Sequence, residues 1–173
     1  RVYSPNSEHS QKFVDEMRGF SSVPQDLEAV DTPEEAVTDA DIICAATTSS
    51  TPVLRYQDLK SGVHINGVGS FQPSMQEIDS ETIRNALVFV DSMESALSET
   101  GDLTIPIQEG IIGKNHLRAE IGELLESPSL GRKTPDEITF FKSCGVAVQD
   151  VIAAGMALEQ AKKHNLGRII RMC

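Results

Sequence analysis

The chain has 173 residues, and 39% of them are hydrophobic, which is enough to bury one well-sized core. Lys and Arg total 15 against 26 Asp and Glu, and the net charge of -11 opposes binding to nucleic acid or to anionic membranes. The three cysteines are widely spaced, which argues against a secreted disulfide framework and against a metal site. These features predict a cytoplasmic protein whose ligand is a small molecule.

The amino-terminal part reads as a strand followed by a helix, twice over. Residues 1–4 have the character of the end of a buried strand, and apolar positions at helical spacing then run to Gly19. The apolar run Leu27–Val30 is a second strand, and Thr32 followed by Pro33 is typical of a helix start. Because nothing resembling a turn precedes the first strand, we expect the chain to be truncated at its start.

Continuous apolar segments follow and predict fully buried strands. They cover residues 41–47, 63–68 and 87–91, and a helix is expected at 79–85 before the last of them. Strands that are apolar on both faces and alternate with helices predict a parallel, doubly wound α/β sheet. Ligands of such sheets gather beyond the carboxyl ends of the strands, so the polar and glycine-bearing residues there are the site candidates.

The rest of the chain departs from this alternation. Pro and Gly make residues 101–113 a loop, with one extended piece at 103–107, and a helix is expected at 116–125. A strand at 138–142 then leads into a long Ala-rich helix from Val146 to His164. This helix has apolar side chains on more than one face, which favours packing on another element or another subunit.

Five short sequence motifs, spread along the chain, carry a resemblance to a known family. They are AATTSSTPVL at 45–54, HINGVG at 64–69, VDS at 90–92, GDL at 101–103 and DEITFFKSCG at 136–145. Together they are similar to the ornithine cyclodeaminase/mu-crystallin family. The resemblance implies a Rossmann-like domain at 1–145 that binds NAD or NADP and lacks its first part. It also implies that 146–173, a helix and tail, contributes to a dimerisation and substrate segment.

The same resemblance implies that several functional parts lie before Arg1. These are the glycine-rich loop that holds the pyrophosphate at a helix amino terminus, an Arg that binds the substrate carboxylate, and a Lys of the catalytic site. The catalytic residues are therefore unassigned within this chain. We expect the polypeptide taken alone to be inactive.

Residues at the strand ends are the expected contacts of the dinucleotide. Ser4 and Asn6 follow a strand whose end often holds a ribose-binding acid or a phosphate-binding base; neither is present, so NAD and NADP are both open. By position and resemblance the remaining contacts are Ala46, Thr47, Thr48, Ser49, Val68, Gly69, Ser143 and Gly145. Short hydroxyls offer hydrogen bonds there, and glycine allows either close approach of the nicotinamide or tight packing of a turn.

Some of these residues also have a structural reading. The segment 4–7 can be a helix cap, with Ser7 the preferred residue, and Ser143 can cap the last helix. The run Thr47–Ser49 can equally be a loop without a ligand.

Other polar residues are expected to have structural roles alone. His64 lies inside a strand, where a buried neutral ring with a backbone partner is expected. Cys144 has small apolar neighbours, which favours a buried structural thiol over a nucleophile. Asp91 and Asp102 are expected to be solvated or to cap backbone groups.

Phe71 is the departure from the family that bears most on the reaction. Ornithine cyclodeaminases and several alanine dehydrogenases carry Asp two residues after the glycine that matches Gly69. A carboxylate there can act as a base or orient water on an imine, and Phe can do neither. Phe71 can also be a packing residue of the loop, without meaning for the mechanism.

Of the reactions considered, reduction of a preformed cyclic imine is the most compatible with Phe at position 71, because it needs only a hydride and one proton. The leading hypothesis is therefore an NAD(P)-dependent reductase of a pyrroline-2-carboxylate or piperideine-2-carboxylate. The alternatives are ornithine cyclodeaminase, with recycled NAD, and a non-catalytic mu-crystallin-like binding protein. In each case the resemblance implies a homodimer.

Overall fold

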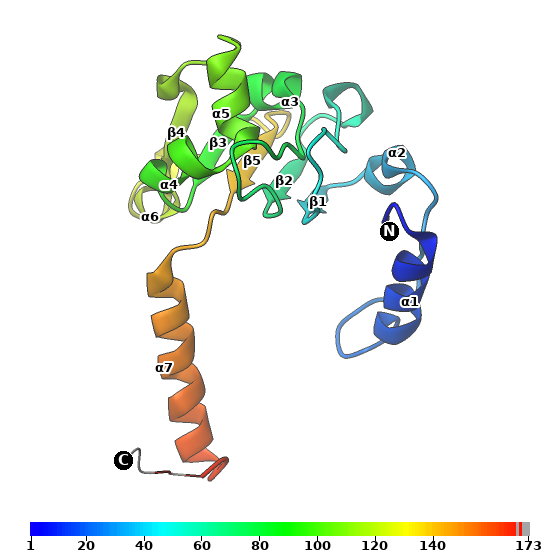
Figure 1. The fold of residues 1–173 in the computed structure, drawn as a ribbon, viewed down its shortest axis with the longest axis vertical. Coiled ribbons are helices and arrows are strands. Elements are labelled where there is room, and N and C mark those ends of the chain that lie inside the picture. The colour runs from blue at the N-terminus through cyan, green and yellow to red at the C-terminus, as the bar shows by residue number, and fades with distance from the viewer. Residues whose placement is uncertain (169, 171–173) are drawn as a thin grey trace.

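The computed structural model describes residues 1–168 and 170, and its centre is a parallel β-sheet (Figure 1). Cys173 and the end of the 146–173 segment lie outside the described residues. The strands are β1 (Ile42–Ala45), β2 (His64–Gly67), β3 (Leu87–Val90), β4 (Leu117–Glu120) and β5 (Thr139–Lys142). The helices are α1 (Ser7–Met17), α2 (Pro33–Val37), α3 (Ser80–Asn85), α4 (Met93–Glu99), α5 (Gly101–Gln108), α6 (Ile121–Glu126) and α7 (Ala147–Lys163). Short 3-10 turns are η1 (Tyr56–Asp58), η2 (Lys114–His116) and η3 (Pro128–Leu130).

The sheet confirms the expected parallel α/β class. Its order is β1-β2-β5-β3-β4, and each of these pairs is parallel. The last residues of β1, β2, β5 and β3 are in register, since Gly67 pairs with both Ala45 and Lys142, and Lys142 pairs with Val90. The loops that follow these strands therefore all start at one edge of the sheet.

The core lies around the middle strands. Phe140 on β5, Ile65 on β2 and Val88 on β3 are fully buried. Burying a side chain of this size stabilises a fold by about 1.5 to 3 kcal/mol. Helices α4 and α5 contact each other and lie over the β3–β4 half of the sheet, as Figure 1 shows.

Capping residues explain where the short helices begin. Thr32 Oγ1 accepts the N–H of Glu35 with Pro33 at the first helical position, as the sequence predicts. Asp79 likewise caps α3 by accepting the N–H of Thr82 at 2.9 Å. At the first helix the expected cap is wrong: the side chain of Asn6, and not of Ser7, accepts the free N–H of Glu8 in α1.

The segment 101–108 is the helix α5, so the extended piece predicted at 103–107 is wrong. Pro106 lies inside this helix and costs it one backbone hydrogen bond. Tertiary packing outweighs that cost, because Leu103 is fully buried and α5 contacts both α3 and α4.

The helix predicted at 116–125 is also wrong in its first half. Residues 117–120 form β4, which pairs with β3, and α6 starts directly after it. Leu117 and Ala119 are buried while Arg118 is exposed, which is the period of a strand. With only four residues and no intervening turn, β4 merges in the sequence with the helix that follows.

Strands are predicted at residues 1–4 and 27–30, but in the structure these segments form only a single parallel bridge, between Val2 and Ala29. At the edge of the sheet β1 buries one face only, because Ile42 is 66% exposed and Cys44 is exposed too. The expectation that every strand is covered on both faces is therefore wrong for β1 in the described residues. Ile42 and Cys44 instead line a hollow beside β1.

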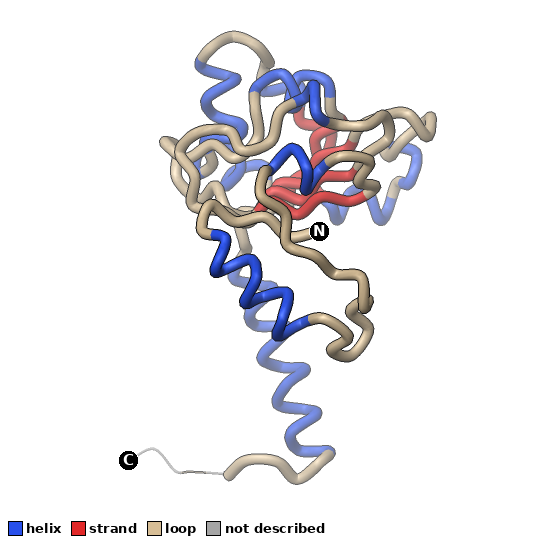
Figure 2. The backbone as a smooth tube through the Cα atoms, turned by 90° about the vertical axis from the view of Figure 1, so that its right-hand side faces the viewer, coloured by secondary structure: helices blue, strands red, loops and turns tan. Residues whose placement is uncertain are grey.

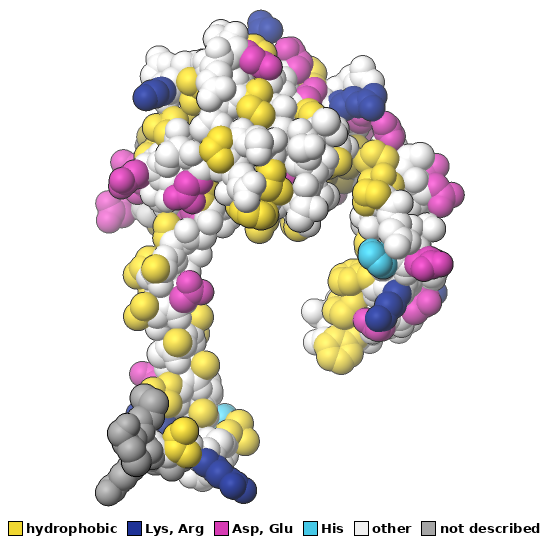
Figure 3. Space-filling view, viewed as in Figure 1, with side chains coloured by type: hydrophobic (Ala, Val, Ile, Leu, Met, Phe, Trp, Pro, Cys, Tyr) yellow, Lys and Arg dark blue, Asp and Glu magenta, His cyan; other side chains and the backbone are white. Residues whose placement is uncertain are grey.

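Helix α7 confirms the long carboxyl-terminal helix and extends away from the sheet (Figures 1 and 2). No residue of α7 is buried, and apolar side chains lie along it (Figure 3). Val151 is 70% and Met156 63% exposed. Within residues 1–168 and 170, the helices lack the combination of length and apolar character that crossing a bilayer requires.

Candidate functional site

Loops after three neighbouring strands lie side by side at one edge of the sheet. They are 46–49 after β1, 68–70 after β2 and 143–145 after β5, and we call this set the carboxyl edge. Val68 N–H donates to the Ala45 carbonyl at 2.8 Å, which joins the first loop to the second. Ser143 N–H donates to the Gly67 carbonyl at 3.0 Å, which joins the second to the third. The structure thus brings together the candidate residues of all three loops.

The loop after β1 is shaped by its own hydroxyl groups. Thr47 Oγ1 accepts the N–H of Ser49 at 3.1 Å, and Ser49 Oγ donates to the Thr51 carbonyl at 2.6 Å. Ala46 and Thr48 are exposed, while Thr47 and Ser49 are half-buried. Thr48 therefore lies on the surface of the loop, and the hydroxyls of Thr47 and Ser49 hold the loop in shape.

Gly69 is required by the close approach of the first two loops. A Cβ at this position would overlap the Thr47 carbonyl oxygen and lie 2.5 Å from both Thr47 N and Glu77 Oε1. Next to it, the Val68 side chain is 52% exposed at the rim. The second loop thus combines an exposed apolar side chain with a glycine that is packed against the first loop.

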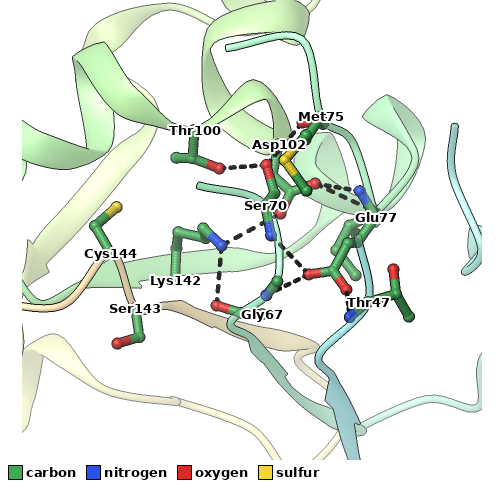
Figure 4. Close-up of polar contacts among 12 residues, drawn as sticks. Thr47, Gly67, Ser70, Met75, Glu77, Thr100, Asp102, Lys142, Ser143 and Cys144 are labelled. Atoms are coloured by element: carbon green, nitrogen blue, oxygen red, sulfur yellow. Dashed lines mark hydrogen bonds and ion pairs between the residues drawn. The ribbon is translucent and has the colours of Figure 1, made fainter. Parts of the chain in front are cut away.

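A buried carboxylate, Glu77, holds these two loops together (Figure 4). Its Oε1 accepts the N–H of Thr47, and its Oε2 accepts the N–H groups of Gly69 at 2.7 Å and Ser70 at 3.0 Å. Glu77 is fully buried, so these contacts lie beneath the carboxyl edge and not on its surface. One side chain therefore satisfies backbone donors from both loops.

Asp102 and Lys142 form a buried pair beside Glu77 (Figure 4). Asp102 Oδ1 accepts the N–H groups of Glu77 at 2.7 Å and Ile78 at 3.1 Å. Lys142 Nζ lies 3.7 Å from Asp102 Oδ2 and donates to the Gly67 carbonyl at 3.2 Å. Burial raises the pKa of Asp102 to about 6, and the Lys142 ammonium and the backbone N–H donors partly offset that rise.

Of the two roles expected of Asp102, the solvated one is wrong, and the other, binding of backbone N–H groups, is confirmed. Its carboxyl has no exposed surface and faces a lysine that is equally buried. The sequence predicts a loop around Asp102. In the structure this segment is helix α5, and Asp102 is buried. A charge so placed is retained only with a partner, since burying it alone is costly.

Asp91, after β3, organises the third loop of the carboxyl edge. Its Oδ2 accepts Ser143 Oγ at 3.1 Å, Cys144 N–H at 2.9 Å and Gly145 N–H at 2.7 Å. The capping role expected of Asp91 is therefore confirmed, for a loop. The expected cap of the last helix is wrong, because α7 starts after Val146 without a side-chain cap and the Ser143 hydroxyl is held by Asp91.

The first predicted segment, 4–6, lies apart from these loops. Asn6 Oδ1 is used to cap α1, and Ser4 is half-buried. A hollow of about 520 Å³ beside β1 is lined by residues 1–3 and by residues 42–47, together with apolar side chains of α1 and α2. Ser4 and Asn6 thus follow one wall of this hollow, and the carboxyl edge begins at the other.

Two further residues have environments that decide their chemistry. His64 bonds side chains and not backbone, with Nδ1 2.7 Å from Thr139 Oγ1 and Nε2 3.3 Å from Asn66 Oδ1, so the expected backbone partner was wrong. The Cys144 thiol is half-buried, and burial together with the Asp91 charge raises its pKa to about 11, which disfavours a nucleophilic thiolate.

Phe71 is 56% exposed beside the carboxyl edge, and its side chain is therefore no part of the core. An aromatic ring can cover a flat ligand or a small apolar substrate, but it neither accepts nor donates a proton. The residues of the edge accordingly provide shape and hydrogen bonds, and the chain places no acid or base at position 71.

Reasoning from the sequence missed Glu77 and Lys142. Lys142 had a detectable signal, because alternation along β5 places it on the same face as the fully buried Phe140. A lysine on a buried face demands a counter-charge, and Asp102 in the GDL string meets that demand. Glu77 had no such signal, since it lies in a polar stretch before α3 whose path only the fold reveals.

Comparisons with known proteins identify related sequences. A model of the ornithine cyclodeaminase/mu-crystallin family matches residues 1–165. A Delta(1)-pyrroline-2-carboxylate reductase of Bacillus cereus is 47% identical over 137 residues, which are 79% of this chain and 42% of the relative. A ketimine reductase mu-crystallin of Rattus norvegicus is 35% identical over 161 residues, 92% of this chain and 46% of that protein.

A solved structure extends the likeness to the fold. Delta(1)-pyrroline-2-carboxylate reductase of Thermococcus litoralis, in complex with NADH and L-proline, superposes with a TM-score of 0.91 at 38% identity. The match covers 98% of this chain and 52% of that structure, so the chain spans about half the length of the relatives it matches. By the extent of these matches, the chain belongs to the ornithine cyclodeaminase/mu-crystallin family.

Proposed function

We propose that this chain supplies the larger part of the dinucleotide-binding domain of an NAD(P)-dependent enzyme that reduces a cyclic imino acid. The substrate class is a pyrroline-2-carboxylate or a piperideine-2-carboxylate. The observation that carries the proposal is the carboxyl edge, whose three loops meet at strand ends that are in register. Support comes from the NADH and proline present in the Thermococcus litoralis relative.

The residues of the carboxyl edge fit a dinucleotide. A Cβ on Gly145 would meet open space, so backbone is accessible there, whereas Gly69 lets the first two loops pack closely together. Thr48 and Ser143 supply hydroxyls, and Val68 supplies an exposed apolar surface for a flat ring. A bound NADH or NADPH would supply the hydride. The segment with Ser4 and Asn6 would take the ribose end, across the hollow beside β1.

The choice of imine reduction rests on Phe71. Its ring cannot orient an attacking water, which a cyclodeaminating lyase or an oxidative deaminase needs. A preformed imine needs no water, and the proton that accompanies the hydride can come from solvent or from residues outside this chain. Ornithine cyclodeamination and mu-crystallin-like binding without catalysis are the alternatives, and relatives of both names belong to the same family.

We further propose that 1–145 is the incomplete nucleotide-binding domain and 146–173 part of a dimerisation and substrate segment in a cytoplasmic homodimer. The support is the exposed apolar surface of α7, which a helix of this length does not keep in water without a partner. An archaeal alanine dehydrogenase with bound NAD, 31% identical, is a dimer.

A chimera tests the proposal directly. This chain replaces the matching 52% of the Thermococcus litoralis reductase, so that the other half comes from that relative. We expect oxidation of NADH that depends on pyrroline-2-carboxylate, followed as the loss of absorbance at the nicotinamide band. The intact relative serves as the positive control, and the relative without the matching segment as the negative one.

The other outcomes separate the alternatives. Release of ammonia from ornithine with no imine-dependent oxidation of NADH would favour the lyase and contradict the proposal. A folded chimera that binds NADH but turns over neither substrate would favour the binding protein. A folded chimera that binds no dinucleotide would also favour the non-catalytic binding protein, and it would contradict both enzymes.

A further inference from the structure

We infer that Glu77 is a positioning residue that sets the geometry of the carboxyl edge for the cofactor. The inference rests on the proposed function, since it assigns a role in binding NAD(P)H. Glu77 itself is fully buried and touches no ligand; it acts through the backbone of the loops after β1 and β2.

The distribution of its contacts carries the inference. Oε1 holds the N–H of Thr47 on one loop, and Oε2 holds the N–H groups of Gly69 and Ser70 on the other. The two oxygens belong to one rigid planar group, so the separation of the loops is fixed by the carboxylate. Gly69 permits that separation, because any side chain there would strike Thr47 and Glu77.

A carboxylate is the group that this arrangement requires. All three of its partners are N–H donors, and a carboxylate accepts at both oxygens. A glutamine of the same shape would turn its NH₂ toward one of the loops, where it would face donors with a donor. That change leaves at least one buried N–H unsatisfied and pushes one loop outward.

Glu77 is itself anchored by a second buried carboxylate, that of Asp102. Asp102 Oδ1 accepts the N–H of Glu77 and of Ile78, which fixes the backbone that carries the carboxylate. Lys142 Nζ faces Asp102 and donates to the Gly67 carbonyl at the end of β2. A continuous chain of contacts thus runs from the end of β5 through α5 to the loops at the edge. Such support keeps binding groups at a fixed geometry.

The test uses Glu77→Gln in the chimera described above. We expect the KM for NADH to rise about tenfold or more, since displacement of a binding loop by about 1 Å has effects of this size. The KM for pyrroline-2-carboxylate should stay within about twofold, because Glu77 does not hold its site. A loss of folded protein alone would lower the apparent kcat and move neither KM, so the two KM values separate positioning from stability.

Glu137→Gln is the matched control. The Glu137 carboxylate also accepts two backbone N–H groups, from Lys133 and Thr134, but in an exposed turn before β5, at the opposite end of the strands. The same chemical change there should leave both KM values unaltered. If Glu77→Gln folds and its KM for NADH equals that of the parent chimera, the inference is wrong while the proposed function stands. A parent chimera without NADH oxidation defeats the proposed function instead.

A measurement on the unmodified chain covers the case in which Glu77→Gln does not fold. Hydrogen exchange followed by NMR should show the amides of Thr47, Gly69 and Ser70 protected far beyond that of the exposed Thr48, because a buried carboxylate holds them. Protection of these three amides supports the inference. Exchange as fast as that of Thr48 would overturn it.

Discussion

Gly67 and Phe140 should be coupled through one close contact in the core. A Cβ at Gly67 would lie 2.6 Å from Cε2 and 2.8 Å from Cζ of the Phe140 ring. Because Phe140 is fully buried in the central strand, its ring has little freedom to move aside. Gly67→Ala should therefore destabilise the fold by about 1 to 3 kcal/mol, the usual cost of overpacking.

Phe140→Leu removes both of the ring atoms that the new Cβ would strike. Alone it should cost roughly 1 to 2 kcal/mol through the space it leaves. In the double variant the Cβ added by Gly67→Ala enters that space, and the next nearest atom, Lys142 Cδ at 3.7 Å, is at ordinary contact distance. The double variant should therefore be more stable than the sum of the single changes by about 1 to 2 kcal/mol.

Urea unfolding followed by circular dichroism measures the four free energies of unfolding in this cycle. Gly122→Ala is the control, because a Cβ there meets nothing within 4 Å and should show no coupling to Phe140→Leu. Strictly additive costs for Gly67→Ala and Phe140→Leu would refute the packing described here.

Three further predictions concern the buried and half-buried groups of the site. The pKa of Asp102 is raised from 3.8 to about 6, so its protonated form stabilises the fold at low pH and that stabilisation is lost as pH rises through 6. The free energy of unfolding of the parent chain relative to Asp102→Asn should thus fall by about 2 kcal/mol between pH 4 and pH 7, and a constant or rising difference would contradict the burial. Asp91→Ala should speed amide exchange of Gly145 by at least about tenfold, since it removes the acceptor at 2.7 Å; unchanged exchange measured by NMR would show another acceptor. Iodoacetamide should modify the exposed Cys44 well before Cys144, whose thiol pKa is raised to about 11; peptide mass mapping that finds Cys144 modified first would contradict its environment.

Much of the fold followed from local patterns in the sequence. The strands at 42–45, 64–67 and 139–142 lie within the predicted apolar segments, and the start of α2 follows from Thr32 and Pro33. The fold class needed no more than this alternation, because buried strands between helices leave a parallel sheet as the consistent arrangement.

The errors arose where tertiary contacts outweigh local preference. Pro106 argues against a helix, yet α5 forms because Leu103 is buried against neighbouring helices. Residues 117–120 were read as helix because β4 is short and joins α6 without a turn. A pairing with β3 decides their structure, and a pairing between distant segments leaves no mark on the four residues themselves.

The loop residues of the candidate site could be predicted from the sequence, whereas the buried residue that supports them could not. Strand-end reasoning found Thr47, Gly69 and Ser143, which the structure places in adjoining loops. It could not find Glu77, because a carboxylate that binds backbone amides of distant loops has no spacing rule in the sequence. Which backbone amides such a carboxylate binds depends on how the folded chain brings the loops together.

A crystal structure of the chimera with NADH tests most directly whether the carboxyl edge is the cofactor site. We expect the nicotinamide ring to lie beside Val68 and Gly69 and the rest of the dinucleotide to run past Thr48 toward the hollow next to β1. A dinucleotide bound at the opposite, amino-terminal ends of the strands, or with no atom within contact distance of these residues, would contradict the account.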